Sequence, residues 1–295
     1  MQCFLRHGTA PVTVAAARGH ALHDIFGRSG VVIGVVHCAP LPGAPDYDGA
    51  PVAGVLARAL DDARAYADAG FDGLIVENHG DVPFLKPEQI GPETSALLAV
   101  IADRVREAAG IPIGINVLAN ATLHALAVAK ASGAAFVRAN QFANAYVANE
   151  GLIEGSAPAA LRYRAMLHAR DVRIFADAHV KHGAHAIVGD RSVAEQVRDV
   201  EFFHADAVIA TGQRTGDAAT EDEIATFRGA TALPLLIGSG VTEANIETIL
   251  RHADGVIVAS AIKHDGVWWN PVDPARAQRF MQRVQALRGP MVHRK

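Results

Sequence analysis

The chain has 295 residues, half of them hydrophobic and one-fifth charged, and its formal net charge at pH 7 is −4. This size and composition suit one large domain with a full core, and an acidic balance without a basic block argues against nucleic-acid binding. Because the two cysteines are widely separated and no apolar run reaches the roughly 18 residues of a bilayer span, we expect a cytoplasmic protein without disulfides or a membrane span.

The first 30 residues are predicted to form an extension that precedes the folded domain. Residues 1–19 read as a loose segment, for which a transit-like peptide is the alternative interpretation. A short helix over residues 20–26 is expected to close the bottom of a barrel.

From Val31 onward, short apolar segments alternate with amphipathic ones. We expect strands over residues 31–37, 73–78, 111–118, 136–141, 173–181, 207–212, 234–240 and 255–260. We expect helices over residues 52–69, 92–109, 122–132, 157–170, 192–203, 220–227, 243–252 and 274–288. Asp62 is expected on the solvated face of the helix over residues 52–69.

Eight such units without a low-complexity linker predict an α/β fold, a single-domain (β/α)8 TIM barrel over residues 31–289, followed by a tail over 290–295. A doubly wound open sheet is the competing architecture. It would need a glycine-rich phosphate loop after the first strand, and Gly34 with Gly43 makes a poor one.

Polar and ionisable residues follow nearly every predicted strand. In TIM barrels the carboxyl ends of the strands carry the functional groups, whereas the opposite ends here begin mostly with apolar residues or glycine. This asymmetry favours an enzyme. In chain order, the residues concerned are His37 and Cys38, Glu77, Asn116, Arg138 and Asn140, Asp177, His179 and Lys181, and Thr211.

The fifth predicted strand carries the densest set of these groups. Because side chains alternate along a strand, Asp177, His179 and Lys181 are expected to share one face. Burying an acid, an imidazole and an amine is costly unless they have partners or a chemical task. The structural alternative is ion pairing at the strand end, with His179 as a spacer.

Acid–base chemistry across the barrel mouth follows from these positions. We expect Asp177 to face either His37 or Cys38, one group acting as acid and the other as base. Lys181 would stabilise an enolate oxygen or form a Schiff base with the substrate. As structural alternatives, His37 would bind a loop carbonyl and Cys38 would be a small buried side chain.

Glu77 is expected to point inward, where it needs a partner such as Lys181 or Arg138. A divalent metal held by some of His37, Glu77, Asp177 and His179 is a further alternative, and no other cofactor is expected.

The seventh and eighth strands are followed by a predicted phosphate site. Gly238, Ser239 and Gly240 precede a helix, and Ser260, Ala261 and Lys263 follow the last strand. Loops at these two strands form the usual phosphate site of TIM barrels, although tight turns would explain them too. A phosphorylated small molecule is therefore the preferred ligand, and Asn116, Arg138, Asn140 and Thr211 are expected to bind the rest of it.

Several longer motifs carry a family resemblance. They are Gly34–Gly43 (GVVHCAPLPG), Glu77–Phe84 (ENHGDVPF), Gly114–Leu118 (GINVL), Gly151–Gly155 (GLIEG), Ala176–His182 (ADAHVKH), Thr211–Gly216 (TGQRTG), Gly238–Gly240 (GSG), Lys263–Gly266 (KHDG) and Pro271–Asp273 (PVD). Over about residues 26–280 the chain resembles the BtpA/SgcQ family of barrel proteins. One departure is His79, where an aromatic or small residue is expected.

The resemblance implies a relative of phosphoribosylanthranilate isomerase and of other phosphate-binding barrels. It also implies two functions, since one branch of the family assembles photosystem I at the thylakoid membrane and another belongs to sugar catabolism. No basic amphipathic helix or lipidation signal suggests membrane docking. We therefore expect an isomerase or a lyase/aldolase acting on a phosphorylated sugar or sugar acid. A non-catalytic assembly factor is the alternative. The oligomeric state stays open, with a homo-oligomer as one possibility because barrels often pair through helix faces.

Overall fold

The computed structural model describes residues 20–212 and 219–288. The predicted loose segment over residues 1–19, the tail over 290–295 and residues 213–216 of the TGQRTG motif lie outside the described residues.

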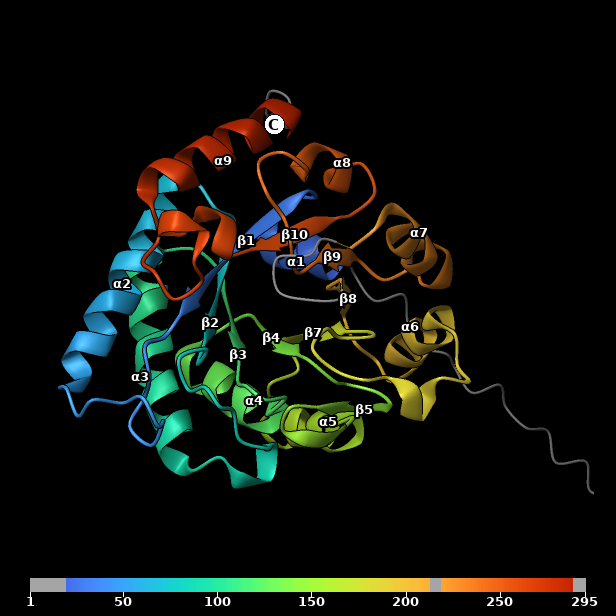
Figure 1. Cartoon of the computed structure of the whole chain (residues 1–295), viewed down its shortest axis with the longest axis horizontal. Coiled ribbons are helices and arrows are strands. Elements are labelled where there is room, and N and C mark those ends of the chain that lie inside the picture. The colour runs from blue at the N-terminus through green and yellow to red at the C-terminus, as the bar shows by residue number, and fades with distance from the viewer. Residues whose placement is uncertain (1–19, 213–218, 289–295) are drawn as a thin grey trace, which may run out of the picture.

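Among the described residues, eight parallel strands close into a TIM barrel, which confirms the predicted architecture (Figure 1). The strands are β1 (Val31–His37), β2 (Gly73–Glu77), β3 (Ile113–Asn116), β4 (Phe136–Ala139), β7 (Arg173–Asp177), β8 (Ala207–Ala210), β9 (Leu235–Ile237) and β10 (Gly255–Val258). Each strand pairs with its neighbour along the chain, and β1 closes the ring by pairing with β10.

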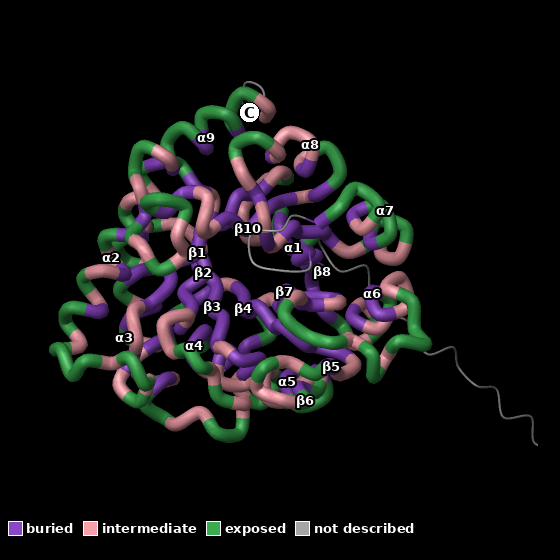
Figure 2. The backbone as a smooth tube through the Cα atoms, viewed as in Figure 1, coloured by how far each residue is buried: buried purple, intermediate pink, exposed green. Residues whose placement is uncertain are grey.

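Helices surround the strands, and the buried residues concentrate between the two layers (Figure 2). The helices of this outer ring are α2 (Val52–Ala69), α3 (Pro92–Ala109), α4 (Thr122–Ser132), α5 (Ala157–Met166), α6 (Val193–Phe202), α7 (Glu221–Ala230), α8 (Ile246–Leu250) and α9 (Pro274–Arg288). Glycines in the left-handed region end α2, α3 and α4, at Gly70, Gly110 and Gly133. These three helices and α9 have the predicted bounds.

A second core fills the barrel interior. Apolar side chains of alternate strand positions, such as Ile33, Phe136 and Phe175, pack there with Ala21 and Leu22 of α1 (Ala21–Phe26). The Phe26 ring lies 6.0 Å from that of Phe136 at the amino-terminal ends of the strands. The helix α1 therefore covers this end of the barrel, and the opposite end remains for a site.

The fifth barrel strand is shorter than predicted. β7 ends at Asp177, and His179 has a φ of 53°, which an extended strand does not adopt. The prediction that Asp177, His179 and Lys181 share one strand face is therefore wrong.

An antiparallel hairpin was not predicted. β5 (Ala145–Ala148) pairs with β6 (Gly151–Glu154) in the connection after β4. In addition, no helix formed by residues 20–212 or 219–288 combines the length and apolar composition that crossing a membrane requires.

Candidate active site at the barrel mouth

A cavity of about 610 Å³ opens at the carboxyl ends of the strands. It is lined by residues that follow β1, β2, β3, β4, β7, β9 and β10, and by the tip of the β5–β6 hairpin. Most of the predicted site residues lie on its wall, namely His37, Glu77, Asn116, Arg138, Asn140, Lys181, Gly238, Ser239, Gly240, Ser260 and Ala261. Cys38, Asp177, His179, Thr211 and Lys263 do not line it.

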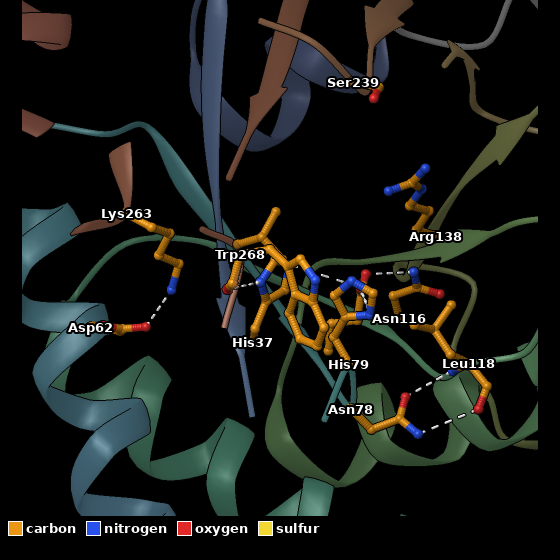
Figure 3. A network of polar contacts seen from close by, with 12 residues as sticks. His37, Asp62, Asn78, His79, Asn116, Leu118, Arg138, Ser239, Lys263 and Trp268 are labelled. Carbon is orange, nitrogen blue, oxygen red and sulfur yellow. Dashed lines mark hydrogen bonds and ion pairs between the residues drawn. The ribbon is translucent and has the colours of Figure 1, made fainter. Parts of the chain in front are cut away.

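Two histidines and a carboxylate converge on one side of the cavity (Figure 3). The Nε2 atom of His37 lies 4.0 Å from Oε1 of Glu77, and the Nδ1 atom of His79 lies 3.9 Å from the same oxygen. The other carboxylate oxygen, Oε2, accepts a hydrogen bond of 2.7 Å from Nδ2 of Asn116. Parallel pairing explains the cluster, because His37, Glu77 and Asn116 are partners in register across β1, β2 and β3.

Aromatic rings enclose this cluster. The Trp268 ring lies 4.1 Å from that of His79 and 5.8 Å from that of His37, and Phe84 stacks on His79. The Trp268 carbonyl lies 3.0 Å from Nδ1 of His37, so this nitrogen carries the proton and donates it. The cluster is thus held in a largely apolar enclosure with one defined histidine tautomer.

Burial governs the pKa values of the cluster. Loss of water lowers the pKa of His37 to about 3, although Glu77 acts in the opposite direction, and it also lowers the pKa of His79. Burial alone would raise the pKa of Glu77. The neighbouring histidines, Arg138 and the hydrogen bond from Asn116 outweigh it, so the pKa of this carboxyl lies below its ordinary value. At neutral pH the cluster therefore holds two neutral imidazoles and one carboxylate.

Asp177 forms a closed ion pair and is not an accessible base. Both of its oxygens accept from Arg138, at 3.0 Å from Nε and 2.8 Å from Nη2, and its side chain is fully buried. Burial disfavours the guanidinium charge, yet Asp177 and Glu77 raise the pKa of Arg138 above its ordinary value. The predicted acid–base pairing of Asp177 with His37 or Cys38 across the mouth is wrong.

His179 and Cys38 also lie away from the cavity. The His179 ring stacks 4.0 Å from that of His185, and its Nδ1 lies 3.4 Å from Oε1 of Gln196 on α6. Cys38 is buried on the helix side of the barrel wall, where desolvation, aided by Asp81 and Glu77, raises the pKa of its thiol to about 12. Neither side chain can act on a molecule in the mouth.

The loops predicted to bind phosphate, after β9 and β10, line the cavity, whereas the predicted Lys263 does not. Lys181 Nζ donates to Ser239 Oγ at 3.2 Å, and Thr211, predicted to bind substrate, instead accepts from the Lys181 backbone N–H at 3.1 Å. Lys263 points behind the barrel wall, where its Nζ lies 2.5 Å from Oδ2 of Asp62 (Figure 3). Asp62 was predicted to be solvated, and it is 3% exposed.

Sequence reasoning did not assign His79 or Trp268 to the site. The sequence did indicate a place for His79. It follows Glu77 by two residues, and side chains at alternate positions of a strand end point to the same side. Its loop is fixed by Asn78, whose Oδ1 accepts from the Leu118 N–H at 2.8 Å and whose Nδ2 donates to Asp81 at 3.0 Å. Trp268 lies more than 180 residues along the chain, and no local pattern marks its position.

Comparisons with known proteins agree with the fold. Residues 28–286 match the model of the BtpA family. A protein of Archaeoglobus fulgidus is 42% identical over 251 residues, which cover 85% of this chain and 97% of that protein. The photosystem I biogenesis protein BtpA of Synechocystis sp. is 40% identical over 264 residues, covering 88% of this chain and 90% of that protein.

Solved structures share the barrel at low sequence identity. Tryptophan synthase of Mycobacterium tuberculosis superposes with a TM-score of 0.57 at 17% identity and covers 90% of this chain and 97% of that chain. N-(5'-phosphoribosyl)anthranilate isomerase of Pyrococcus furiosus has a TM-score of 0.52 at 12% identity, with coverages of 86% and 98%. At these identities the likeness shows the fold alone.

Proposed function

The chain belongs to the BtpA family, and from this membership and the geometry of the mouth we propose that it is an enzyme acting on a phosphorylated sugar or sugar acid. The observation that carries the proposal is the division of one cavity into two chemically different sides. His37, Glu77 and His79 lie on one side, and Lys181 with the loops after β9 and β10 lies on the other.

The phosphate is proposed to lie beside Lys181. The Gly238–Gly240 loop and Ser260 with Ala261 line the cavity at the two strands whose loops bind phosphate in many TIM barrels. Lys181 reaches this region through its hydrogen bond to Ser239, and it takes the role predicted for Lys263. A lysine and small residues at one end of a cavity suit a dianionic group, because backbone groups can approach it closely.

The reacting carbons are proposed to lie toward Glu77. Its carboxylate can take a proton from carbon, which is the step that an isomerase and a lyase share. Asn116 and Asn140 line the same cavity, and in the described part of the chain the Oδ1 atom of each is buried without a hydrogen-bond partner. Substrate hydroxyls would satisfy these two acceptors, as a sugar or sugar acid provides.

Ligand-dependent thermal stability tests the proposal. A panel of phosphorylated sugars and sugar acids, with the unphosphorylated compounds as controls, should raise the melting temperature only when phosphate is present. Lys181→Met should weaken this binding by about 10- to 100-fold, because it removes a charged hydrogen-bond donor. Lys130→Met, an exposed site on α4, serves as the matched control. If phosphorylated and unphosphorylated compounds behave alike, the phosphate site is refuted.

A second candidate, a non-catalytic assembly factor, is favoured by the name of the Synechocystis relative, a photosystem I biogenesis protein. Complementation of a deletion strain separates the two functions, because only the enzyme needs a reactive carboxylate. If Glu77→Gln and Lys181→Met chains both restore the strain fully, catalysis is not the function. The cytoplasmic location and the homo-oligomer remain predictions.

A further inference from the structure

We propose that His37, Glu77 and His79 bind one divalent transition-metal ion at the wall of the mouth cavity. Nε2 of His37, Oε1 of Glu77 and Nδ1 of His79 would be the three protein ligands, and the remaining coordination positions would face the cavity. The metal site stands on its own geometry, whereas its role toward a substrate rests on the proposed function.

The three ligand atoms already converge. All lie within 4.8 Å of one another, and Oε1 of Glu77 lies 4.0 Å and 3.9 Å from the two imidazole nitrogens. Around a tetrahedral ion with bonds of about 2.0–2.1 Å, ligand atoms lie about 3.4 Å apart. Closing on an ion therefore needs the two pairs that include Oε1 to contract by about 0.5–0.6 Å and the two histidine nitrogens by up to about 1.4 Å, through rotation of the side chains.

Neighbouring groups orient two of the ligands. The Trp268 carbonyl accepts from Nδ1–H of His37, and this leaves the lone pair on Nε2, the atom that faces Glu77. Asn116 holds Oε2 of Glu77 and leaves Oε1 toward the histidines. A histidine bound to a carbonyl through its second nitrogen, and a carboxylate fixed through its second oxygen, are the outer contacts that metal sites use.

The unsatisfied Nδ1 atom of His79 is evidence for the ion that does not depend on the distances between the ligand atoms. Nδ1 of His79 is inaccessible to water and has no hydrogen-bond partner in the described part of the chain. Leaving such an atom unsatisfied is unfavourable, and native proteins seldom do so without a ligand.

The ligand set selects the kind of metal. Two imidazoles and one carboxylate suit Zn²⁺, Fe²⁺, Co²⁺ or Mn²⁺, whereas Mg²⁺ and Ca²⁺ prefer oxygen ligands alone. Three protein ligands with an open position are typical of catalytic rather than structural sites. An ion here would engage Oε1 of Glu77, so in the metal-loaded chain Glu77 would be a ligand rather than the base, and the ion would polarise a carbonyl or hydroxyl oxygen of a molecule whose phosphate lies at Lys181.

Metal titration of the purified full chain tests the site. After dialysis against a chelator, calorimetry with Zn²⁺ and Co²⁺ should show one ion per chain with a Kd of about 1 μM or below, and Mg²⁺ should bind far more weakly. Glu77→Gln and His79→Phe should each weaken Zn²⁺ binding at least about 100-fold. His252→Asn, an exposed histidine, should change nothing and controls for surface binding.

Spectroscopy of the ion bound to the wild-type chain tests the site even if a variant folds poorly. X-ray absorption of the Zn²⁺-loaded wild-type chain should show two imidazole ligands and oxygen. Absence of stoichiometric binding, or a Kd that both variants leave unchanged, overturns the proposal. Metal binding without any response to phosphorylated ligands would retain the metal site and refute the proposed function instead.

Discussion

Two buried groups of charged residues in this barrel differ in how their polar atoms are satisfied. Behind the wall, Asp62 accepts from Lys263 with one oxygen and from the Val272 N–H, at 2.7 Å, with the other. At the mouth, Glu77 faces two imidazole nitrogens at about 4 Å, and the buried Nδ1 of His79 has no partner in the described part of the chain.

The contrast separates structural from functional burial. In the first group, the charged atoms of Asp62 and Lys263 all have partners. This pair links α2 to the segment before α9 and leaves no atom for a ligand. A buried atom such as Nδ1 of His79, which has no hydrogen-bond partner in the described part of the chain, is a deficit that a bound species removes. Burial of ionisable groups is therefore a weaker guide to a site than the count of their missing partners.

Removing one partner of the satisfied pair should have the largest effect. Asp62→Ala leaves the Lys263 ammonium buried without a counter-charge, and we expect a loss of about 3–5 kcal/mol in the free energy of unfolding. Denaturant unfolding measures it, with the exposed neighbour Asp61→Ala as a control that should change little. The double change Asp62→Leu with Lys263→Met should recover most of this loss but not all of it, because the Val272 N–H then lacks its acceptor. A loss below about 1 kcal/mol for Asp62→Ala would contradict the interpretation that the Asp62–Lys263 pair stabilises the fold.

The mouth cluster should respond more weakly. Glu77→Gln removes a carboxylate whose pKa lies below its ordinary value, so the folded state favours the charge, and we expect the metal-free chain to be slightly less stable than wild type. Zn²⁺ at 100 times its Kd should stabilise the wild-type chain by about 2.7 kcal/mol, an effect that the variant lacks. Unfolding curves with and without Zn²⁺ measure both effects. If the metal-free Glu77→Gln chain is strongly destabilised, the cluster is structural and the contrast fails.

The sequence predicted the barrel because each unit repeats the same local signals. Apolar strands alternate with helices that end at left-handed glycines such as Gly70 and Gly110, and these signals require no distant partner. Strand ends were predicted less well, since residues such as His179 adopt a positive φ that local periodicity does not encode.

The sequence predicted where the site lies in the barrel, but not which side chains contact one another there. Strand ends gave His37, Glu77 and Asn116, because neighbouring parallel strands bring them together in register. Asp177 and Lys263 were misassigned, since their partners Arg138 and Asp62 depend on side-chain direction. Asp62 had a local signal, as it lies at helical spacing between the buried residues Ala59 and Tyr66 on α2.

Asn116 tests whether the mouth cluster is held by its outer contacts. Asn116→Leu removes the hydrogen bond to Oε2 of Glu77 while preserving volume, and we expect Zn²⁺ affinity to fall about 10- to 100-fold. Asn140→Leu is the matched control, because this residue lines the same cavity and, among the described residues, no hydrogen bond joins it to the cluster. Calorimetric titration distinguishes them. Equal losses for the two variants would mean that cavity polarity, rather than orientation of Glu77, controls the affinity.

The smallest expected effect concerns Cys38. It tests whether the strands of the barrel separate this thiol from the mouth cavity. Cys38 follows His37 directly, yet its side chain lies on the helix side, where burial raises the thiol pKa to about 12. The thiolate is the reactive form, so at pH 9 only about one native molecule in a thousand carries it. We expect no alkylation of Cys38 by iodoacetamide between pH 7 and 9 in the folded chain, and rapid alkylation above the ordinary thiol pKa once the chain is unfolded. Peptide mapping by mass spectrometry measures both. Rapid modification of Cys38 in the folded chain would show that the thiol reaches the cavity, and the acid–base role predicted for it would then stand again.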